Sequence, residues 1–262
     1  MTRTPFVLST ADAVGWLRAQ PAESVDLLIT DPAYESLEKH RAIGTTTRLK
    51  HSKSSSNDWF KIFPNARFAE LFREVFRVLK RNSHFYLMCD AETMFFAKTP
   101  AEEAGFRFWK PLVWDKCSIG MGYHYRARYE FVLFFEKGKR RLNDLGIADV
   151  ISVPRIRGGY PAEKPAEVAE VLIAQSSNTG DLVADPFMGS ASVGVAALRL
   201  GRRFAGNDLN PEAVAIADRR LRDLAGEPTA APAPQPAPQP AREPDQADLL
   251  DGLFAANSAP RR

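Results

Sequence analysis

Short apolar runs alternate with segments of helical periodicity along most of this 262-residue chain. The runs with the length and composition of buried strands are 24–30, 84–89, 129–135, 181–185 and 203–207. The segments with helical spacing of apolar residues are 68–79, 165–175, one that ends at 200, and 211–224. Because strands alternate with helices, the sequence predicts an α/β fold with a doubly wound, mostly parallel sheet covered on both faces.

The cysteine content and the hydropathy pattern exclude several classes of protein. The two cysteines, Cys89 and Cys117, are too few for a disulfide scaffold or a four-thiolate zinc site, and no metal site is expected. No apolar run approaches the ~18 residues that a membrane span requires. The first residues contain no long apolar segment of the kind found in secretory signals. These features favour a cytoplasmic protein.

A change of composition near residue 227 predicts where the folded domain ends. Residues 1–226 are expected to form one domain, with 35–64 as a loop insertion. Residues 227–245 are rich in Pro, Ala and Gln, a composition that forms extended linkers and cannot pack a core. Residues 246–262 form a short apolar C-terminal segment that contains Leu249, Leu250, Leu253 and Phe254.

The segment 185–192, with the sequence DPFMGSAS, lies between a predicted strand and a predicted helix. Its small residues let a ligand approach the backbone, and the free N–H groups at the start of a helix attract polar or anionic groups. Asp208 directly follows the next predicted strand, where a carboxylate can accept hydrogen bonds from ribose hydroxyls. A tight turn without a ligand is the alternative, but the position of Asp208 favours a nucleoside-type cofactor.

A second motif, Asp31-Pro32-Ala33-Tyr34, follows the predicted strand 24–30. The Asp31 carboxylate and the Pro32 carbonyl can each accept one hydrogen of an exocyclic amine, and Tyr34 can stack on a planar base. A turn of this kind is common and means little by itself. Because ligands of open α/β sheets bind at the carboxyl ends of strands, we expect both motifs to meet there.

Together these motifs resemble those of the β-class amino-group DNA methyltransferases, in which the catalytic motif precedes the cofactor motif. Asp31, Pro32 and Tyr34 match the family's D-P-P-Y, and 185–191 matches D-P-F-x-G-S-G. Residues 201–212 match G-R-R-F-x-G-x-[DE]-x-x-P-E, and 163–165 resemble the E-K-P segment that contacts S-adenosylmethionine. The resemblance covers 6–224 and is greatest to enzymes of phages, prophages and orphan bacterial loci.

The resemblance implies the Rossmann-like fold of S-adenosylmethionine-dependent methyltransferases with a circularly permuted motif order. It also implies methylation of the N6 amino group of adenine in double-stranded DNA, by base flipping and direct in-line transfer. In the family, an Asp at the first motif position goes mostly with adenine. The expected catalytic residues are Asp31, Pro32 and Tyr34. The expected cofactor-binding residues are Tyr160, Lys164, Pro165, Asp185, Phe187, Gly189, Ser190, Ser192 and Asp208.

Three features depart from the family pattern. Ala33 replaces the second proline of the catalytic motif, which stiffens the turn less. Ala191 replaces a glycine of the cofactor motif, and its Cβ is expected to crowd the cofactor. The stretch 137–160, where β-class enzymes usually carry a target-recognition domain, is too short to form one.

Cationic residues follow the catalytic motif, and no acid occurs between positions 39 and 56. This pattern favours contact with DNA phosphates, although a solvated loop is the alternative. A second candidate is 120–128, where aromatic and basic side chains interleave; a core β-hairpin with a basic edge is as consistent with the pattern. The expected DNA-binding residues are Lys39, Arg41, Arg48, Lys50, Lys53, Tyr123, Arg126 and Arg128.

Several alternatives stay open at this point. The acceptor could be cytosine N4, RNA or a protein glutamine, or the chain could be a catalytically silent DNA-binding subunit. Family resemblance implies a homodimer and leaves open a partner restriction nuclease. In the tail, Gln246-Ala-Asp-Leu-Leu250 resembles the peptide with which bacterial replication enzymes bind the sliding clamp. A C-terminal helix that packs on the body, or a tail without function, competes with that interpretation.

Overall fold

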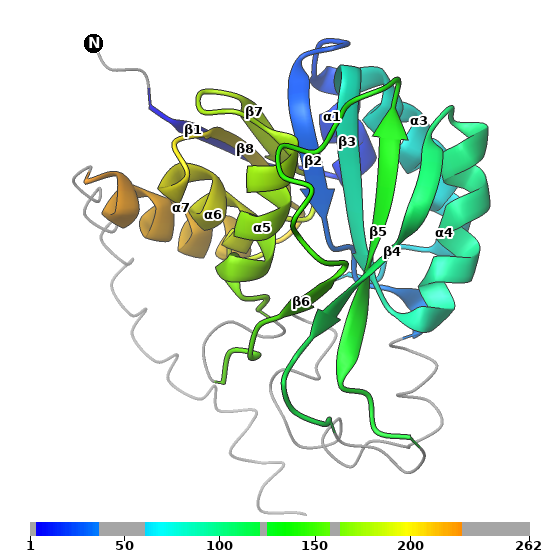
Figure 1. Ribbon diagram of the computed structural model, residues 1–262. Coiled ribbons are helices and arrows are strands. Elements are labelled where there is room, and N and C mark those ends of the chain that lie inside the picture. The colour runs from blue at the N-terminus through cyan, green and yellow to red at the C-terminus, as the bar shows by residue number, and fades with distance from the viewer. Residues whose placement is uncertain (1–3, 37–60, 121–124, 158–162, 227–262) are drawn as a thin grey trace, which may run out of the picture. The chain divides into compact units, whose positions relative to one another are not determined.

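The computed structural model describes residues 4–36, 61–120, 125–157 and 163–226 (Figure 1). Within this part of the chain lies an eight-stranded sheet with the order β1-β8-β7-β2-β3-β5-β4-β6. Its strands are β1 (Phe6–Thr10), β2 (Val25–Thr30), β3 (Leu79–Cys89), β4 (Arg107–Asp115), β5 (Tyr129–Lys137), β6 (Val150–Ser152), β7 (Leu182–Asp185) and β8 (Arg203–Asp208). Of these described strands, only β5 runs antiparallel to its neighbours. The predicted α/β fold with a mostly parallel sheet is confirmed.

Helices cover both faces of the sheet (Figure 1). They are α1 (Ala13–Ala19), α3 (Phe68–Val78), α4 (Ala91–Glu103), α5 (Ala166–Ser176), α6 (Ser192–Arg199) and α7 (Pro211–Ala225), with a 3-10 helix η3 (Asn65–Arg67) before α3. Side chains alternate between the two cores along each strand. On β2, Leu27 and Ile29 pack with α5, α6 and α7, whereas Leu28 packs with α1, α3 and α4. Both faces are therefore apolar, as a covered parallel sheet requires.

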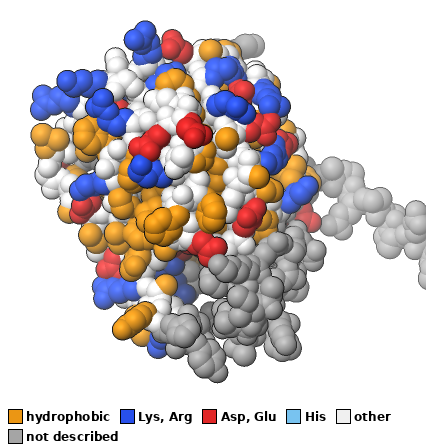
Figure 2. Space-filling model, turned by 90° about the vertical axis from the view of Figure 1, so that its right-hand side faces the viewer, with side chains coloured by type: hydrophobic (Ala, Val, Ile, Leu, Met, Phe, Trp, Pro, Cys, Tyr) orange, Lys and Arg blue, Asp and Glu red, His pale blue; other side chains and the backbone are white. Residues whose placement is uncertain are grey.

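The helix α4 and the strand β4 are two elements that the sequence pattern does not single out. α4 contains Pro100 and has no clear apolar face, because Phe95 and Phe96 point to solvent with 77% and 50% of their surface exposed. Figure 2 shows this side of the molecule, on which hydrophobic side chains gather among charged ones. None of the helices in the described ranges is both long enough and apolar enough to cross a lipid bilayer.

The pairing of β2 with β7 brings the two sequence motifs together. The strands are parallel, with Leu27 opposite Val183 and Leu28 opposite Ala184. Their carboxyl ends therefore lie at the same edge of the sheet, and the Thr30 hydroxyl donates a hydrogen bond of 2.8 Å to Oδ1 of Asp185. Topology thus places residues from distant parts of the sequence beside one another at the position where open α/β sheets bind ligands.

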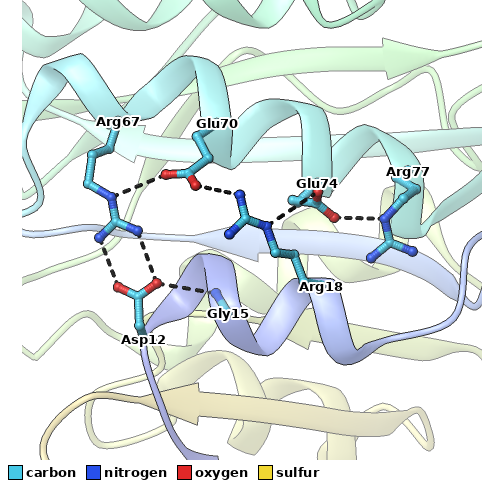
Figure 3. A network of polar contacts seen from close by, with 7 residues as sticks. All are labelled: Asp12, Gly15, Arg18, Arg67, Glu70, Glu74 and Arg77. Carbon is cyan, nitrogen blue, oxygen red and sulfur yellow. Dashed lines mark hydrogen bonds and ion pairs between the residues drawn. The ribbon is translucent and has the colours of Figure 1, made fainter.

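A network of charged side chains joins α1 to η3 and to α3 along its length (Figure 3). Asp12 caps α1 by accepting a hydrogen bond from Gly15 N at 3.2 Å, and it receives two hydrogen bonds from Arg67 at 2.8 and 3.0 Å. The other ion pairs are Arg67–Glu70 at 3.4 Å, Arg18–Glu70 at 2.5 Å, Arg18–Glu74 at 3.8 Å and Arg77–Glu74 at 2.7 Å. The network fixes the start of α1 next to the carboxyl end of the sheet.

Candidate active site

A cavity of about 850 Å³ opens where β2, β7 and β8 end. Its volume lies in the range of small-molecule sites. Every expected catalytic and cofactor residue in the described ranges lines it: Asp31, Pro32, Tyr34, Lys164, Pro165, Asp185, Phe187, Gly189, Ser190, Ser192 and Asp208. The remaining one, Tyr160, lies outside the described residues. The predicted side chains in the described ranges therefore share one cavity, and their individual roles stay predictions.

Asp185, the last residue of β7, anchors the turn that leads into α6. Its Oδ1 accepts hydrogen bonds from the Thr30 hydroxyl at 2.8 Å and from Phe187 N at 3.0 Å. The side chain is almost fully buried, and this burial raises the pKa of Asp185 to about 7. The carboxyl group thus holds the backbone of the turn in place beside the cavity.

Asp208, at the end of β8, is bound to the same turn. Its Oδ2 accepts a hydrogen bond from Gly189 N at 2.9 Å, and its Oδ1 accepts one from Asn210 N at 2.9 Å. Burial raises the pKa of this carboxyl above its usual value. The backbone N–H of Leu209 interacts with the same carboxylate, and because a carboxylate offers about four acceptor positions, at least one stays available for a ligand hydroxyl.

The conformation of Ala191 changes the expectation that its Cβ crowds the cofactor. Ala191 is fully buried and does not line the cavity, so its Cβ points away from the ligand space. The residue instead has φ of 61° and ψ of 44°, the left-handed conformation that favours glycine. Replacement of the family's glycine therefore affects the backbone energy of the turn and not the room for a ligand.

The catalytic turn is held by contacts from its own tyrosine and from a distant segment. The Tyr34 hydroxyl donates a hydrogen bond of 2.5 Å to Oδ1 of Asp31, and only 7% of the tyrosine is exposed. Phe63 N donates to the Ala33 carbonyl at 2.8 Å. Burial raises the pKa of Tyr34 well above its usual value, so the hydroxyl keeps its proton and remains a donor to Asp31. The tyrosine ring lines the cavity, and its hydroxyl positions the carboxylate.

Lys164 contacts the catalytic turn directly. Its ammonium group donates a hydrogen bond to Oδ2 of Asp31 and lies 3.4 Å from Oε2 of Glu130. Burial alone would lower the pKa of Lys164, but the two carboxylates outweigh it and raise that pKa, so the lysine is charged. Burial raises the pKa of Asp31 in spite of the lysine. Lys164, expected at the cofactor, is thus placed on the carboxylate of the catalytic turn.

Motif reasoning missed several residues that line the cavity, among them Asp12, Arg67 and Glu130. Asp12 precedes a segment of helical spacing, as an N-cap residue does, which is a signal that the sequence offered. Glu130 lies inside an apolar run that indicates only a strand. The Asp12–Arg67 and Glu130–Lys164 ion pairs join segments far apart in the chain and leave no local pattern.

The described part of 120–128 extends the β4–β5 hairpin. Lys116 N donates to the Arg128 carbonyl at 2.9 Å, and Gly120 N donates to the Ala127 carbonyl at 2.8 Å. The Arg128 guanidinium donates two hydrogen bonds of 2.7 Å to Asp115, and Arg126 Nε donates to the Gly120 carbonyl at 2.7 Å. The other expected DNA-binding residues, Lys39, Arg41, Arg48, Lys50, Lys53 and Tyr123, lie outside the described residues.

Comparison with known proteins agrees with this geometry. A family model described as DNA methylase matches residues 25–219. The chain is 29% identical over 250 residues to DNA adenine methyltransferase YhdJ of Escherichia coli K12, a match that covers 80% of each protein. It is 27% identical over 245 residues to type II methyltransferase M2.DpnII of Streptococcus pneumoniae, covering 84% of this chain and 90% of the relative.

The fold is shared with solved structures. The crystal structure of TTHA0409, described as a DNA modification methylase from Thermus thermophilus, superimposes with a TM-score of 0.62 at 22% sequence identity. The match covers 82% of this chain and 94% of that protein. The sheet and its helices therefore have the same fold as that structure.

Proposed function

The chain belongs to the DNA methylase family, and we propose that it transfers a methyl group from S-adenosylmethionine to the N6 amino group of adenine in double-stranded DNA. The observation that carries the proposal is the common cavity. Asp31 and Tyr34 of one motif and Asp185, Gly189 and Asp208 of the other line it together. A site for an amine and a site for a nucleoside cofactor are thus adjacent, as an in-line transfer between two bound molecules requires.

The residues around the cofactor turn fit S-adenosylmethionine in charge and hydrogen bonding. Asp208 keeps an acceptor position for a ribose hydroxyl, and small residues such as Gly189 and Ser190 leave the backbone of the turn accessible. Pro165 and Phe187 add apolar surface to the same cavity. When bound, S-adenosylmethionine supplies a methyl group on a positively charged sulfur.

The catalytic turn can orient the acceptor amine. The Asp31 carboxylate and the Pro32 carbonyl each accept one hydrogen of an exocyclic NH₂ group, and this directs the nitrogen lone pair away from them. The Tyr34 hydroxyl and Lys164 hold the carboxylate from two sides. The adenine must leave the duplex to reach this turn, so base flipping is part of the proposal.

Adenine is favoured over cytosine on two grounds. Asp31 occupies the motif position that goes mostly with adenine in the family, and YhdJ is named an adenine methyltransferase.

Methylation at cytosine C5 would need a thiolate nucleophile in the cavity. Cys89 is buried and burial raises its pKa, and Cys117 does not line the cavity.

We propose that 35–64 supplies most contacts to DNA phosphates, through Lys39, Arg41, Arg48, Lys50 and Lys53. The charge pattern supports this: the stretch carries these cations without an acid from 39 to 56 and joins directly to the catalytic turn. Arg126 and Arg128, which extend the β4–β5 hairpin, would add a second contact together with Tyr123, which lies outside the described residues. In a transfer assay on double-stranded DNA, loss of the first group should raise KM more than it lowers kcat.

Two partnerships extend the proposal. Resemblance to β-class enzymes supports a homodimer, which the mass of the protein in light scattering at several concentrations would test. The sequence Gln246-Ala-Asp-Leu-Leu250 supports binding to the replication sliding clamp, which would bring the enzyme to newly made DNA. Calorimetric titration of the full chain against the host clamp, with Gln246→Ala and Leu250→Ala as controls, would decide the second.

The central experiment incubates the purified protein with labelled S-adenosylmethionine and a duplex DNA library, then identifies the modified base and its context by single-molecule sequencing. We expect N6-methyladenine at one short sequence. N4-methylcytosine would support the alternative acceptor, and transfer to RNA but not to DNA would refute the proposal. Cofactor binding without any transfer would indicate a catalytically silent DNA-binding subunit.

A further inference from the structure

An alternating row of charged side chains extends from the catalytic turn into the sheet. Asp31 is paired with Lys164, Lys164 with Glu130 at 3.4 Å, and Glu130 with Lys116 at 2.6 Å. The four side chains are between 15% and 24% exposed, so water screens them only partly. They come from four parts of the fold: the turn after β2, the segment before α5, β5, and the residue after β4.

Glu130 divides its interactions between two lysines. Its Oε1 is paired with Lys116 at 2.6 Å. Its Oε2 is buried and receives no hydrogen bond within the described residues, and its nearest cation is Lys164 at 3.4 Å. Because Glu130 and Asp31 both interact with the Lys164 ammonium, any change at Glu130 alters how strongly the lysine holds Asp31.

We propose that Glu130 and Lys116 are positioning residues for the methyl transfer, which set the charge and orientation of Asp31 through Lys164. The inference rests on the proposed function, because it assigns Asp31 to the acceptor amine. Glu130 lines the cavity but belongs to neither sequence motif, and Lys116 does not line the cavity. The effect of Lys116 on the reaction therefore passes through Glu130 and Lys164, and Glu130 acts on Asp31 both directly by its charge and through Lys164.

The reaction makes the charge state of Asp31 important. The transfer forms a bond between the amine nitrogen and the methyl carbon and breaks the bond from that carbon to sulfur, whose electron pair stays on sulfur. The nitrogen must then release one proton, to Asp31 or to water. An ionised Asp31 accepts hydrogen bonds at both oxygens and can take up the proton, whereas a protonated one has fewer acceptor positions, donates a hydrogen bond itself and cannot take up the proton.

The row predicts opposite effects of changing Glu130 and of changing Lys116. Glu130→Gln removes a negative charge near Asp31. Asp31 is then the only carboxylate of the row that interacts with Lys164, so the pKa of Asp31 falls. Lys116→Met removes the cation on Oε1 of Glu130, so Glu130 competes more strongly for Lys164 and the pKa of Asp31 rises. A merely structural role would not give shifts of opposite sign.

Other ionisable groups that face Asp31 come from three further positions. Tyr34 on the same turn and Cys89 at the end of β3 both stay protonated, because burial raises their pKa values. Asp185 at the end of β7 titrates near pH 7 and causes no difference between variants, since it is present in all of them. Comparison between variants therefore isolates the effect of Glu130 and Lys116.

The experiment measures the acid limb of kcat on duplex DNA for the wild type, Glu130→Gln, Glu130→Asp and Lys116→Met. We expect the midpoint to move down by about 1 pH unit in Glu130→Gln and up in Lys116→Met, with partial rescue in Glu130→Asp. Lys110→Met is the matched control, because Lys110 forms an ion pair of the same 2.6 Å length with Asp149 away from the cavity. Unchanged midpoints, or shifts of the same sign, would overturn the proposal.

A second readout separates this proposal from the proposed function. The carboxyl carbon of Asp31, assigned with Asp31→Asn, is titrated by NMR in the same variants without DNA. If the pKa of Asp31 shifts in opposite directions in Glu130→Gln and Lys116→Met but the protein does not methylate DNA, the row of charges is supported and the proposed methyl transfer is refuted. If the protein methylates DNA normally but neither variant changes the pKa of Asp31, the role of the row is refuted and the proposed function stands. Cofactor affinity, measured by calorimetry, shows that each variant is folded.

Discussion

Lys164 and Asp31 lie 133 positions apart in the sequence and form an ion pair at the carboxyl end of β2. The lysine precedes α5 and the aspartate begins the first motif, so the contact ties the segment before the cofactor motif to the catalytic turn. The charged lysine stabilises the ionised carboxylate against the effect of burial. This geometry leads to the first prediction.

Asp31→Ala should abolish methylation, lowering kcat by about 10²–10⁴-fold, with little change in cofactor affinity. Asp31 contacts the acceptor side of the cavity, whereas the proposed ribose contact is Asp208. Single-turnover transfer to DNA and calorimetry with S-adenosylmethionine give the two quantities. An equal loss of cofactor binding and activity would contradict the assignment of Asp31 to the amine.

Asp208→Ala should act in the opposite way and weaken cofactor binding. Loss of charge-assisted hydrogen bonds to the ribose is worth about 1.5–3 kcal/mol, or roughly 10–150-fold in Kd. Asp218→Ala is the control, since Asp218 lies in α7, forms an ion pair with Arg222 and does not line the cavity. If Asp208→Ala bound the cofactor as tightly as the wild type, the ribose contact would be assigned to the wrong residue.

The parts of the site that could be predicted are those set by local sequence. Asp31, Asp185 and Asp208 each directly follow or end an apolar run, and parallel strands bring such positions to one edge of a sheet. The positions of strands and helices can be predicted as well, because they follow from the periodicity of apolar side chains in the local sequence. These features require only neighbouring residues and the rules of α/β topology.

The rest depends on contacts between distant segments. Glu130 lies in an apolar run, and nothing near it in the sequence indicates that it faces Lys164 and Lys116. The orientation of the Ala191 Cβ depends on the backbone conformation of the turn, which is fixed by hydrogen bonds to Asp185 and Asp208. Sequence patterns do not contain these distances, so only the three-dimensional structure provides them.

Ala191→Gly should stabilise the protein. The left-handed conformation of Ala191 costs about 1–2 kcal/mol for an L-residue, and the added freedom of glycine in the unfolded chain offsets part of this gain. We expect a net gain of about 0.5–1 kcal/mol in the free energy of unfolding, measured with urea. Ala215→Gly is the matched control, because it makes the same change at an exposed position of α7 and should destabilise. Destabilisation of both variants would contradict the role of backbone strain.

Neutralising Arg48, Lys50 and Lys53 together should weaken binding to every DNA sequence and reduce its salt dependence. Each bound phosphate contributes about 0.9 to the slope of log K against log salt concentration, so the slope should fall by up to that amount for each phosphate that the variant no longer binds. Fluorescence anisotropy on a duplex with the target site and on an unrelated duplex gives both slopes. An unchanged slope would indicate that this stretch is a solvated loop that does not touch DNA.

His84 on β3 is a buried titratable group that makes stability depend on pH. Its Nε2 donates a hydrogen bond to the Arg140 carbonyl at 3.1 Å, and its Nδ1 accepts one from the Ser176 hydroxyl at 2.7 Å. The Ser176 oxygen in turn accepts a hydrogen bond from the Tyr86 hydroxyl at 2.7 Å. Burial lowers the pKa of His84 from 6.5 to about 4, so the imidazole is neutral near pH 7 and its Nδ1 acts as the acceptor.

The pKa of His84 is lower in the folded protein than in the unfolded chain. Between pH 6.5 and about pH 4, the unfolded chain therefore carries a proton on this residue that the folded protein does not carry. Stability from this residue is therefore complete above pH 6.5 and is lost as the pH falls toward 4. Between about pH 7.5 and about pH 5, the wild type should lose about 2 kcal/mol more than His84→Gln, which keeps a donor and an acceptor but does not titrate. Asp185, whose pKa is raised to about 7, changes stability in the opposite direction over this range, so only the difference between the two proteins is informative. Equal pH dependence of urea unfolding in both proteins would show that His84 is not held neutral in the folded state.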